Sequence, residues 1–311
     1  MNSVDKIGKL EEAISHFPTI KQFIGIDRIL NLAQKDSVSP LVYYLERSLY
    51  DEDKVKQLMS DFRKNPRHVG VLIILDYYLN YYWTMKHLDH CLSEIKDCPK
   101  IDVFIRHLLD SNSFWQGYCE VEVAANVKQT FGKVELEPLM PNGKSVDVKF
   151  YLNSDEVFVE VSAPKTGDLY RKALEKATGR VVKLPDVKQR AVDRLLDELE
   201  HFKGILDEIK SVIVLNLNES DFDDLEIEDI LSGIELRLLV EKSAKNLSAS
   251  PTIMRNGWTL FESEPDLRKV GAVICYKRNF DILSGNIIYT KRIFAISFES
   301  KETTELSMLF Q

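Results

Sequence analysis

The chain has 311 residues, of which 44% are hydrophobic and 29% are charged, and its formal net charge is −8. This composition argues against disorder over most of the chain, because enough apolar surface is present to build a core. The negative charge argues against a protein that coats nucleic acid over its whole surface. Any contact with nucleic acid would need a local basic patch, or a bound cation that offsets an acidic cluster.

The length allows two domains, and the first predicted region, residues 1–108, is helical throughout. Prolines that can begin helices punctuate it, namely Pro18, Pro40 and Pro66. The stretches Lys54–Arg63 and Val69–Leu92 predict helices by their apolar periodicity. Aromatic residues in the second stretch favour a helix–helix core, although base stacking is an alternative. We expect this region to clamp a substrate or to bind a protein partner, including a second copy of the chain.

The sequence shows no feature that would place the protein outside the cytoplasm or in a membrane. The cysteines are scattered without a CxxC pair, which indicates reduced thiols and a cytoplasmic protein. The first residues lack the apolar core of a signal peptide. The apolar run Val71–Met85 contains Asp76 and Asn80 and is too short to span a bilayer, so we expect no membrane contact.

After residue 108 the pattern changes to alternating helices and strands, which predicts an α/β domain with a mixed sheet over residues 109–311. Ser113–Phe131 predicts a helix that Gly132 ends as a C-cap. Pro141–Lys144 contains an Asn-Gly pair, a strong hairpin signal. Val187–Phe202 predicts a further helix. Strands are predicted at Val134–Leu136, Ser145–Leu152, Glu156–Ala163, Ser211–Leu217, Ala272–Lys277, Ile287–Tyr289 and Ile293–Phe298.

Two acidic residues interrupt neighbouring Val-rich strands of this domain. Because side chains alternate between faces along a strand, Asp147 shares a face with Lys149, and Glu160 shares a face with Ser162. A carboxylate in the middle of an apolar strand is costly unless it has a partner. A divalent cation such as Mg²⁺ or Mn²⁺, held by Asp147 and Glu160, would provide that partner.

Asp147, thirteen residues before Glu160-Val161-Ser162, resembles the core motif of the PD-(D/E)xK nuclease superfamily, which has the restriction-endonuclease-like fold. The order of helix, hairpin, strand, helix and strand between about residues 113 and 218 is similar as well. The resemblance implies a metal-dependent nuclease that hydrolyses phosphodiester bonds in DNA or RNA. It also implies a catalytic glutamate on the preceding helix, for which Glu122 is favoured over Glu120, expected to be a solvated charge.

One position departs from the family pattern, because Ser162 stands where the family has its catalytic lysine. A serine cannot supply positive charge near a phosphate. Substitutes could come from Lys149 on the Asp147 face, from Lys165 beyond the strand or from Lys188 on the next helix. The alternative function is therefore a nuclease-fold protein that has lost catalysis and binds nucleic acid or protein.

A basic segment follows the second acidic strand. Residues 165–190 hold eight basic residues against three acidic residues, an asymmetry in an otherwise acidic chain. Such a strip would contact a phosphate backbone in a salt-dependent manner, although a solvated helix face is the alternative. The predicted nucleic-acid contacts are Lys165, Arg171, Lys172, Lys176, Arg180 and Lys188.

Overall fold

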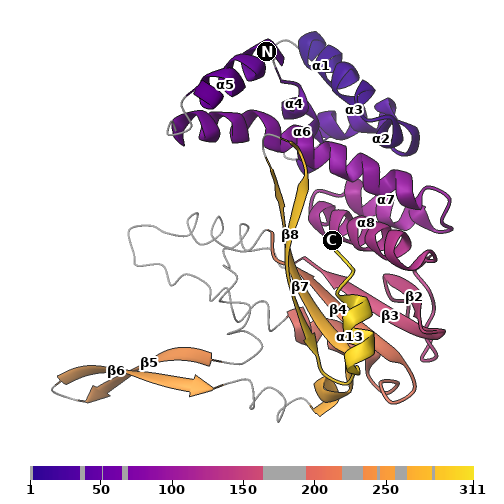
Figure 1. Cartoon of the computed structure of the whole chain (residues 1–311), viewed down its shortest axis with the longest axis vertical. Coiled ribbons are helices and arrows are strands. Elements are labelled where there is room, and N and C mark those ends of the chain that lie inside the picture. The colour runs from indigo at the N-terminus through magenta and orange to yellow at the C-terminus, as the bar shows by residue number, and fades with distance from the viewer. Residues whose placement is uncertain are drawn as a thin grey trace.

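The computed structural model describes residues 3–35, 39–50, 52–64, 69–163, 194–218, 234–243, 246–255, 265–281 and 284–311. The protein belongs to the α/β class, with a helical N-terminal region followed by a six-stranded mixed sheet, as the sequence predicts. Figure 1 shows the helix α8 (Phe114–Phe131) between the other helices and the sheet.

The N-terminal region consists of short helices around one long helix. In chain order they are α1 (Ser3–Ser15), α2 (Pro18–Phe23), α3 (Ile26–Lys35), α4 (Pro40–Ser48), α5 (Glu52–Lys64), α6 (Val69–Ile95) and α7 (Ile101–Leu109). Pro18 and Pro40 begin α2 and α4, where a missing backbone N–H costs nothing. The two helices predicted from apolar periodicity correspond to α5 and α6. None of the helices in the described part of the chain is both long and apolar enough to cross a bilayer.

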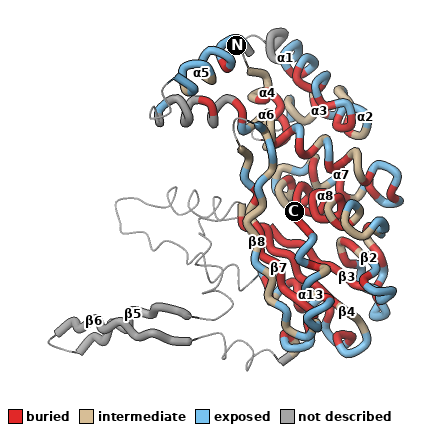
Figure 2. The backbone as a smooth tube through the Cα atoms, viewed as in Figure 1, coloured by how far each residue is buried: buried red, intermediate tan, exposed pale blue. Residues whose placement is uncertain are grey.

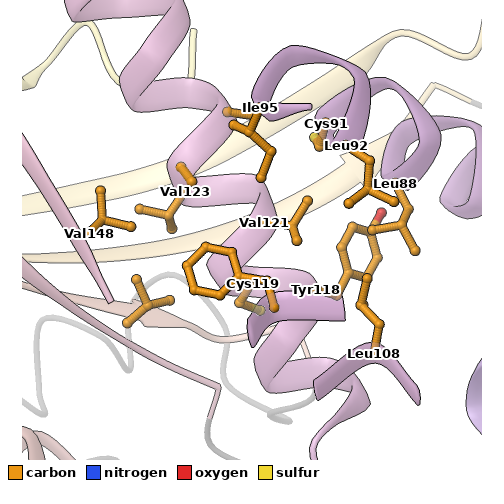
Figure 3. Packing of buried hydrophobic residues seen from close by; sticks show 14 of the residues in the cluster. Leu88, Cys91, Leu92, Ile95, Leu108, Tyr118, Cys119, Val121, Val123 and Val148 are labelled. Atoms are coloured by element: carbon orange, nitrogen blue, oxygen red, sulfur yellow. The ribbon is translucent and has the colours of Figure 1, made fainter. Parts of the chain in front are cut away.

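The helix α8 is buried on nearly every side, which differs from the surface helix that its pattern suggests. All residues from Gly117 to Ala125 are buried, because α6 and α7 pack on one side of the helix and β2 and β3 on another. Figure 3 shows Val121 and Val123 among Leu88, Ile95 and other residues of the surrounding core. Gly132 ends the helix as predicted, with φ of 79° and its N–H donated to the carbonyl of Lys128.

The sheet has the strand order β1-β2-β3-β4-β7-β8. The strands β2 and β3 are antiparallel, β3, β4 and β7 are parallel, and β7 and β8 are antiparallel. Their bounds are β1 (Glu135–Leu136), β2 (Val148–Leu152), β3 (Asp155–Ser162), β4 (Lys210–Asn216), β7 (Ala272–Phe280) and β8 (Ile287–Ala295). A separate two-stranded sheet pairs β5 (Ile234–Ser243) with β6 (Asn246–Arg255).

Both faces of the central strands are buried, as Figure 2 shows by the red tube through the sheet. Alternate residues divide between two clusters: Val159 and Val161 join the core under α8, whereas Phe158 joins a second core. From residues 194–206 the second core receives Leu195, Leu199, Ile205 and Leu206, together with Phe202 of the 3-10 helix η1 (Glu200–Phe202). This double burial explains why the strands read as continuous apolar runs.

Most of the predicted strands are present, with two differences. The two segments predicted at 287–289 and 293–298 fall on the single strand β8, which ends at Ala295, because the polar residues Thr290, Lys291 and Arg292 interrupt the apolar pattern but not the strand. The hairpin β5–β6 was not predicted at all. Of the helix predicted at 187–202, residues 194–199 are described and helical, and η1 follows them. Two short elements complete the fold, the 3-10 helix η2 (Pro265–Lys269) and the helix α13 (Ser300–Leu306).

Candidate metal centre

Asp147 and Glu160 lie side by side at the start of β2 and near the end of β3. The antiparallel register pairs Val148 with Val159, so the next pair outward is Asp147 with Glu160. Their carboxyl groups hydrogen-bond to each other. Asp147 also accepts the backbone N–H of Val161 at Oδ2 over 2.7 Å, which fixes its side chain against β3. The structure therefore brings together the two acidic residues that the sequence pairs.

Two further residues, Glu198 and His201, join this pair from the connection between the parallel strands β3 and β4. His201 of η1 places Nδ1 2.5 Å from Glu160 Oε1 and 3.9 Å from Glu198 Oε2. Potential ligand atoms of Glu160, Glu198 and His201 all lie within 4.8 Å of one another, which is close enough to share one ion. Glu198 also accepts a hydrogen bond from the Ser162 hydroxyl, so the serine of the motif position is part of this centre.

Glu120 approaches the same carboxylates from α8. It is 1% exposed, and its charge raises the pKa of both Asp147 and Glu160. His107 of α7 lies 2.6 Å from its Oε2. The Gln116 amide donates to Glu120 Oε1 and to the carbonyl of Val161, and its oxygen accepts the N–H of Ala163. Gln116 thereby ties α8 to the end of β3. The expectation that Glu120 is solvated was wrong, because α7 covers this side of the helix.

We name Glu120, Asp147, Glu160, Glu198, His107 and His201 together the acidic centre. Burial raises the pKa of Asp147 well above its ordinary range, and the neighbouring charges of Glu160 and Glu120 add to the effect. Burial likewise raises the pKa of Glu160 and that of Glu198. The hydrogen bond that the His107 imidazole donates to Glu120 raises the pKa of His107. Among the described residues, the basic side chains within ion-pair distance of these carboxylates are the two histidines, which carry a positive charge only when protonated.

The predicted catalytic residue Glu122 lies in a different environment, on another side of α8. Its Oε2 accepts hydrogen bonds from Arg278 Nη1 and from the Tyr276 hydroxyl, both over 2.7 Å. Its Oε1 accepts the Tyr289 hydroxyl over 3.0 Å. Although burial opposes it, the Arg278 charge lowers the pKa of Glu122. A helical wheel assumes one buried face, whereas α8 is buried nearly all round, so the wheel does not separate Glu120 from Glu122 by burial.

The same buried network explains His87, which the sequence analysis did not place in the site. Its Nδ1 lies 2.9 Å from the Tyr118 hydroxyl, and its Nε2 lies 3.2 Å from Cys91 Sγ. Burial lowers the pKa of His87 to about 3, so the imidazole is neutral at neutral pH. We infer that His87 is a core residue whose ring nitrogens are satisfied by these neighbours.

Lys149, the favoured substitute for the missing lysine, pairs with acidic residues of the sheet. Its Nζ lies 3.1 Å from Glu135 Oε2 and 3.0 Å from Glu156 Oε1. Partial burial would lower its pKa, but these two partners outweigh that effect and raise it. The ammonium is thus directed along β2 toward Glu135 and Glu156. The predicted nucleic-acid contacts Lys165, Arg171, Lys172, Lys176, Arg180 and Lys188 lie outside the described residues.

Glu198 and His201 are the residues that the sequence analysis missed. They stand three positions apart in a predicted helix whose apolar positions Leu195, Leu199 and Phe202 point to the second core. A glutamate and a histidine at this spacing, directly beside the buried stripe, were the available signal. Comparisons of the chain with protein-family models, with curated proteins and with solved structures return no match.

Proposed function

We propose that this protein is a divalent-metal-dependent nuclease whose metal is held by the acidic centre. The observation that supports the proposal is the convergence of Asp147, Glu160, Glu198 and His201 from three parts of the fold onto one place. Structural ion pairs would place lysine or arginine opposite such carboxylates, but here the described ion-pair partners are histidines. A cation would relieve the cost of burying these acids together.

The donor set fits a divalent ion and indicates which one. Carboxylate oxygens suit Mg²⁺ and Mn²⁺ alike, whereas imidazole nitrogen is a poor ligand for Mg²⁺ and a good one for transition metals. With His201 beside Glu160 and Glu198, we expect Mn²⁺ to bind more tightly than Mg²⁺. When bound, such an ion acidifies a coordinated water and neutralises charge on a phosphate.

The protein's own residues would hold the metal-binding carboxylates in position and provide positive charge. Asp147 is held by the Val161 N–H and Glu160 by His201, so both carboxylates keep their direction without an ion. Burial raises the pKa of the Glu198 carboxyl, which is the direction expected for a carboxyl that takes up and releases a proton during a reaction. His107, hydrogen-bonded to Glu120, would provide the positive charge that Ser162 cannot.

A second candidate function is a binding module that keeps the fold and has lost catalysis. Two observations favour it: Ser162 donates to Glu198 instead of presenting a charge, and Lys149 is engaged by Glu135 and Glu156. In that case nucleic acid or a protein partner would bind without being cut. The two functions differ in whether metal binding is coupled to hydrolysis.

The test combines calorimetric titration with Mn²⁺ and Mg²⁺ and cleavage assays on single-stranded, duplex and branched DNA and RNA. Asp147→Ala, Glu198→Ala and His201→Ala should each weaken Mn²⁺ binding by at least about tenfold, as loss of a ligand or its support does. The control is Glu200→Gln, because Glu200 is the exposed neighbour of His201 and pairs with Lys203.

Cleavage by the wild type that is lost in Asp147→Ala would support the nuclease. Unchanged Mn²⁺ binding in the first three variants would contradict the centre itself. If metal binds but neither the wild type nor Ser162→Lys cuts any substrate, while nucleic acid is still bound, the binding-module function holds instead.

A further inference from the structure

A second cavity lies apart from the acidic centre, where α4, α6, α8 and β7 meet. Its volume is about 310 Å³, and Tyr44, Trp115 and Phe280 contribute aromatic rings to its lining. Asn80, Thr84 and Arg278 contribute polar groups. A volume of this size is at the lower end of small-molecule sites. It can hold one ring system with a sugar, but not a duplex or a folded peptide.

The aromatic side chains form a connected set. The rings of Tyr44 and Trp115 meet edge to face with centroids 5.3 Å apart, and Trp115 stacks on Tyr118 at 5.9 Å. The guanidinium of Arg278 lies 4.1 Å over the Tyr118 ring. Packing holds these rings in place, so a planar ligand could stack without ordering them first.

The charge of the lining favours a neutral polar ligand. Arg278 is already neutralised by Glu122 at 2.7 Å, so the cavity does not require an anion. Its Nε has no hydrogen-bond partner among the described residues, which leaves one donor unsatisfied. Asn80 is exposed; its oxygen accepts the Thr84 hydroxyl over 3.4 Å and keeps a second lone pair, and its NH₂ group is a donor. Donors and acceptors beside stacked rings match the edge and face of a nucleobase.

The cavity is also placed where ligands bind in sheets of this kind. Arg278 and Phe280 lie at the end of β7, beyond the paired part of β4. Trp115 directly precedes Gln116, which hydrogen-bonds to the end of β3 and to Glu120. The carboxyl ends of parallel strands are the usual ligand side of open α/β sheets. The cavity and the acidic centre are therefore linked through one turn of α8.

We propose that this cavity binds a single unpaired nucleobase of a nucleic-acid strand. The proposal deepens the proposed nuclease function by naming a substrate class, single-stranded or locally opened nucleic acid. A base paired within a duplex cannot enter a cavity of this volume, so it would have to leave the stack first. Trp115 and Tyr44 provide the stacking surface, and Asn80 reads the edge of the base.

The test measures binding without metal, so that it is independent of catalysis. Fluorescently labelled single-stranded six-residue DNA and RNA homopolymers are titrated in EDTA, with free nucleosides as competitors. Trp115→Ala should weaken binding about 5- to 100-fold, the loss expected for one stacked base, and Trp115→Phe should restore most of it. Asn80→Ala should reduce discrimination among the four bases. The matched control is Tyr151→Ala, a partly exposed aromatic residue on β2 outside the cavity.

The outcomes separate this proposal from the proposed function. Unchanged affinity in Trp115→Ala, or nucleosides that fail to compete, would overturn the base site. Asp147→Ala should bind the homopolymers in EDTA as the wild type does. A base site that survives alongside a total lack of metal-dependent cleavage would leave this inference standing and remove the nuclease.

Discussion

Two glutamates of α8, only two positions apart, contact different sets of residues. Residues at this spacing point about 200° apart around a helix, so Glu120 faces the acidic centre and Glu122 faces Arg278. Glu122 has a full cationic partner, whereas Glu120 has His107. Arg278 stabilises the buried negative charge of Glu122. His107 carries a positive charge only when protonated, so the acidic centre has more acidic groups than positive charges. This difference places Glu122 in a buried ion pair and Glu120 in the acidic centre, and the catalytic role of Glu122 stays a prediction.

At the residue scale, breaking the Glu122–Arg278 pair should be costly. Arg278→Met leaves a buried carboxylate without its cation and should destabilise the protein by roughly 3–5 kcal/mol in urea unfolding. The double variant Glu122→Gln/Arg278→Met should recover part of that loss, because no buried charge remains. The control Lys277→Met, on the neighbouring position of β7, should change stability by about 0.5 kcal/mol or less. Equal losses in Arg278→Met and Lys277→Met would contradict the buried pair.

At the scale of elements, the contact of α7 with α8 is what carries His107 to Glu120. The helices approach closely at Gly117, where a Cβ atom would lie 2.6 Å from His107 Cβ and 3.0 Å from the backbone nitrogen of Leu108. The backbone of α7 cannot move away from an added Cβ atom as easily as the end of a flexible side chain can. A glycine at this position is therefore required for the helix spacing.

Gly117→Ala should push α7 away from α8 and destabilise the protein by about 1–3 kcal/mol, the usual cost of overpacking. It should also lower the pKa of His107 toward its ordinary value, because the hydrogen bond to Glu120 raises it. NMR titration of the histidines measures the second effect. Gly8→Ala is the control, since nothing lies within 4 Å of its added Cβ, and it should stabilise α1 by about 0.5–1 kcal/mol. An unmoved His107 pKa would argue that another contact positions the ring.

At the scale of the whole molecule, the acidic centre links stability to pH and to metal. The pKa values of Asp147, Glu160 and Glu198 are raised in the folded state, so the folded protein holds protons that the unfolded chain releases. Their stabilising contribution is complete below the unfolded pKa, near 4. It is lost as pH rises through the folded values.

Asp147→Asn should therefore raise the melting temperature of the metal-free protein at pH 8 by about 2 °C or more, and the gain should shrink toward pH 5. The asparagine oxygen can still accept the Val161 N–H, so geometry is preserved. With Mn²⁺ in excess the order should reverse, because the wild type gains more binding energy than the variant. A difference in melting temperature between Asp147→Asn and the wild type that is the same at pH 5 and pH 8 in EDTA would contradict the raised pKa of this carboxyl.

Local rules predicted much of this fold. The Asn-Gly turn lies between β1 and β2, and the cap at Gly132 ends α8. The register that opposes Asp147 to Glu160 is fixed by the turn at Asn153 and Ser154, which joins β2 to β3. Glu198 and His201 could not be placed in the same way, because their position depends on a long crossover and not on a local turn. The β5–β6 hairpin was not predicted although Ile234–Leu238 alternates apolar and polar residues, and Pro251 in the middle of β6 argues against a strand.

One hydrophobic core extends across the domain boundary that the sequence predicts at residue 108. One cluster runs from Leu10 of α1 through Phe104 of α7 and Val159 of β3 to Phe310 near the C-terminus. The predicted regions 1–108 and 109–311 thus share their interior in the described part of the chain. Apolar periodicity reveals that a helix has a buried face, but not which partner covers it.

The strand β7 is held along both of its edges and beyond its C-terminal end. It pairs with β4 on one side and β8 on the other, and the hairpin beyond it presses Gly285 against the Trp83 ring of α6. Figure 1 shows this hairpin extending from the sheet to the helices. The amide hydrogens of Val273 to Tyr276 should consequently be among the slowest to exchange with solvent, since exposing them would require the sheet and the helical layer to come apart together.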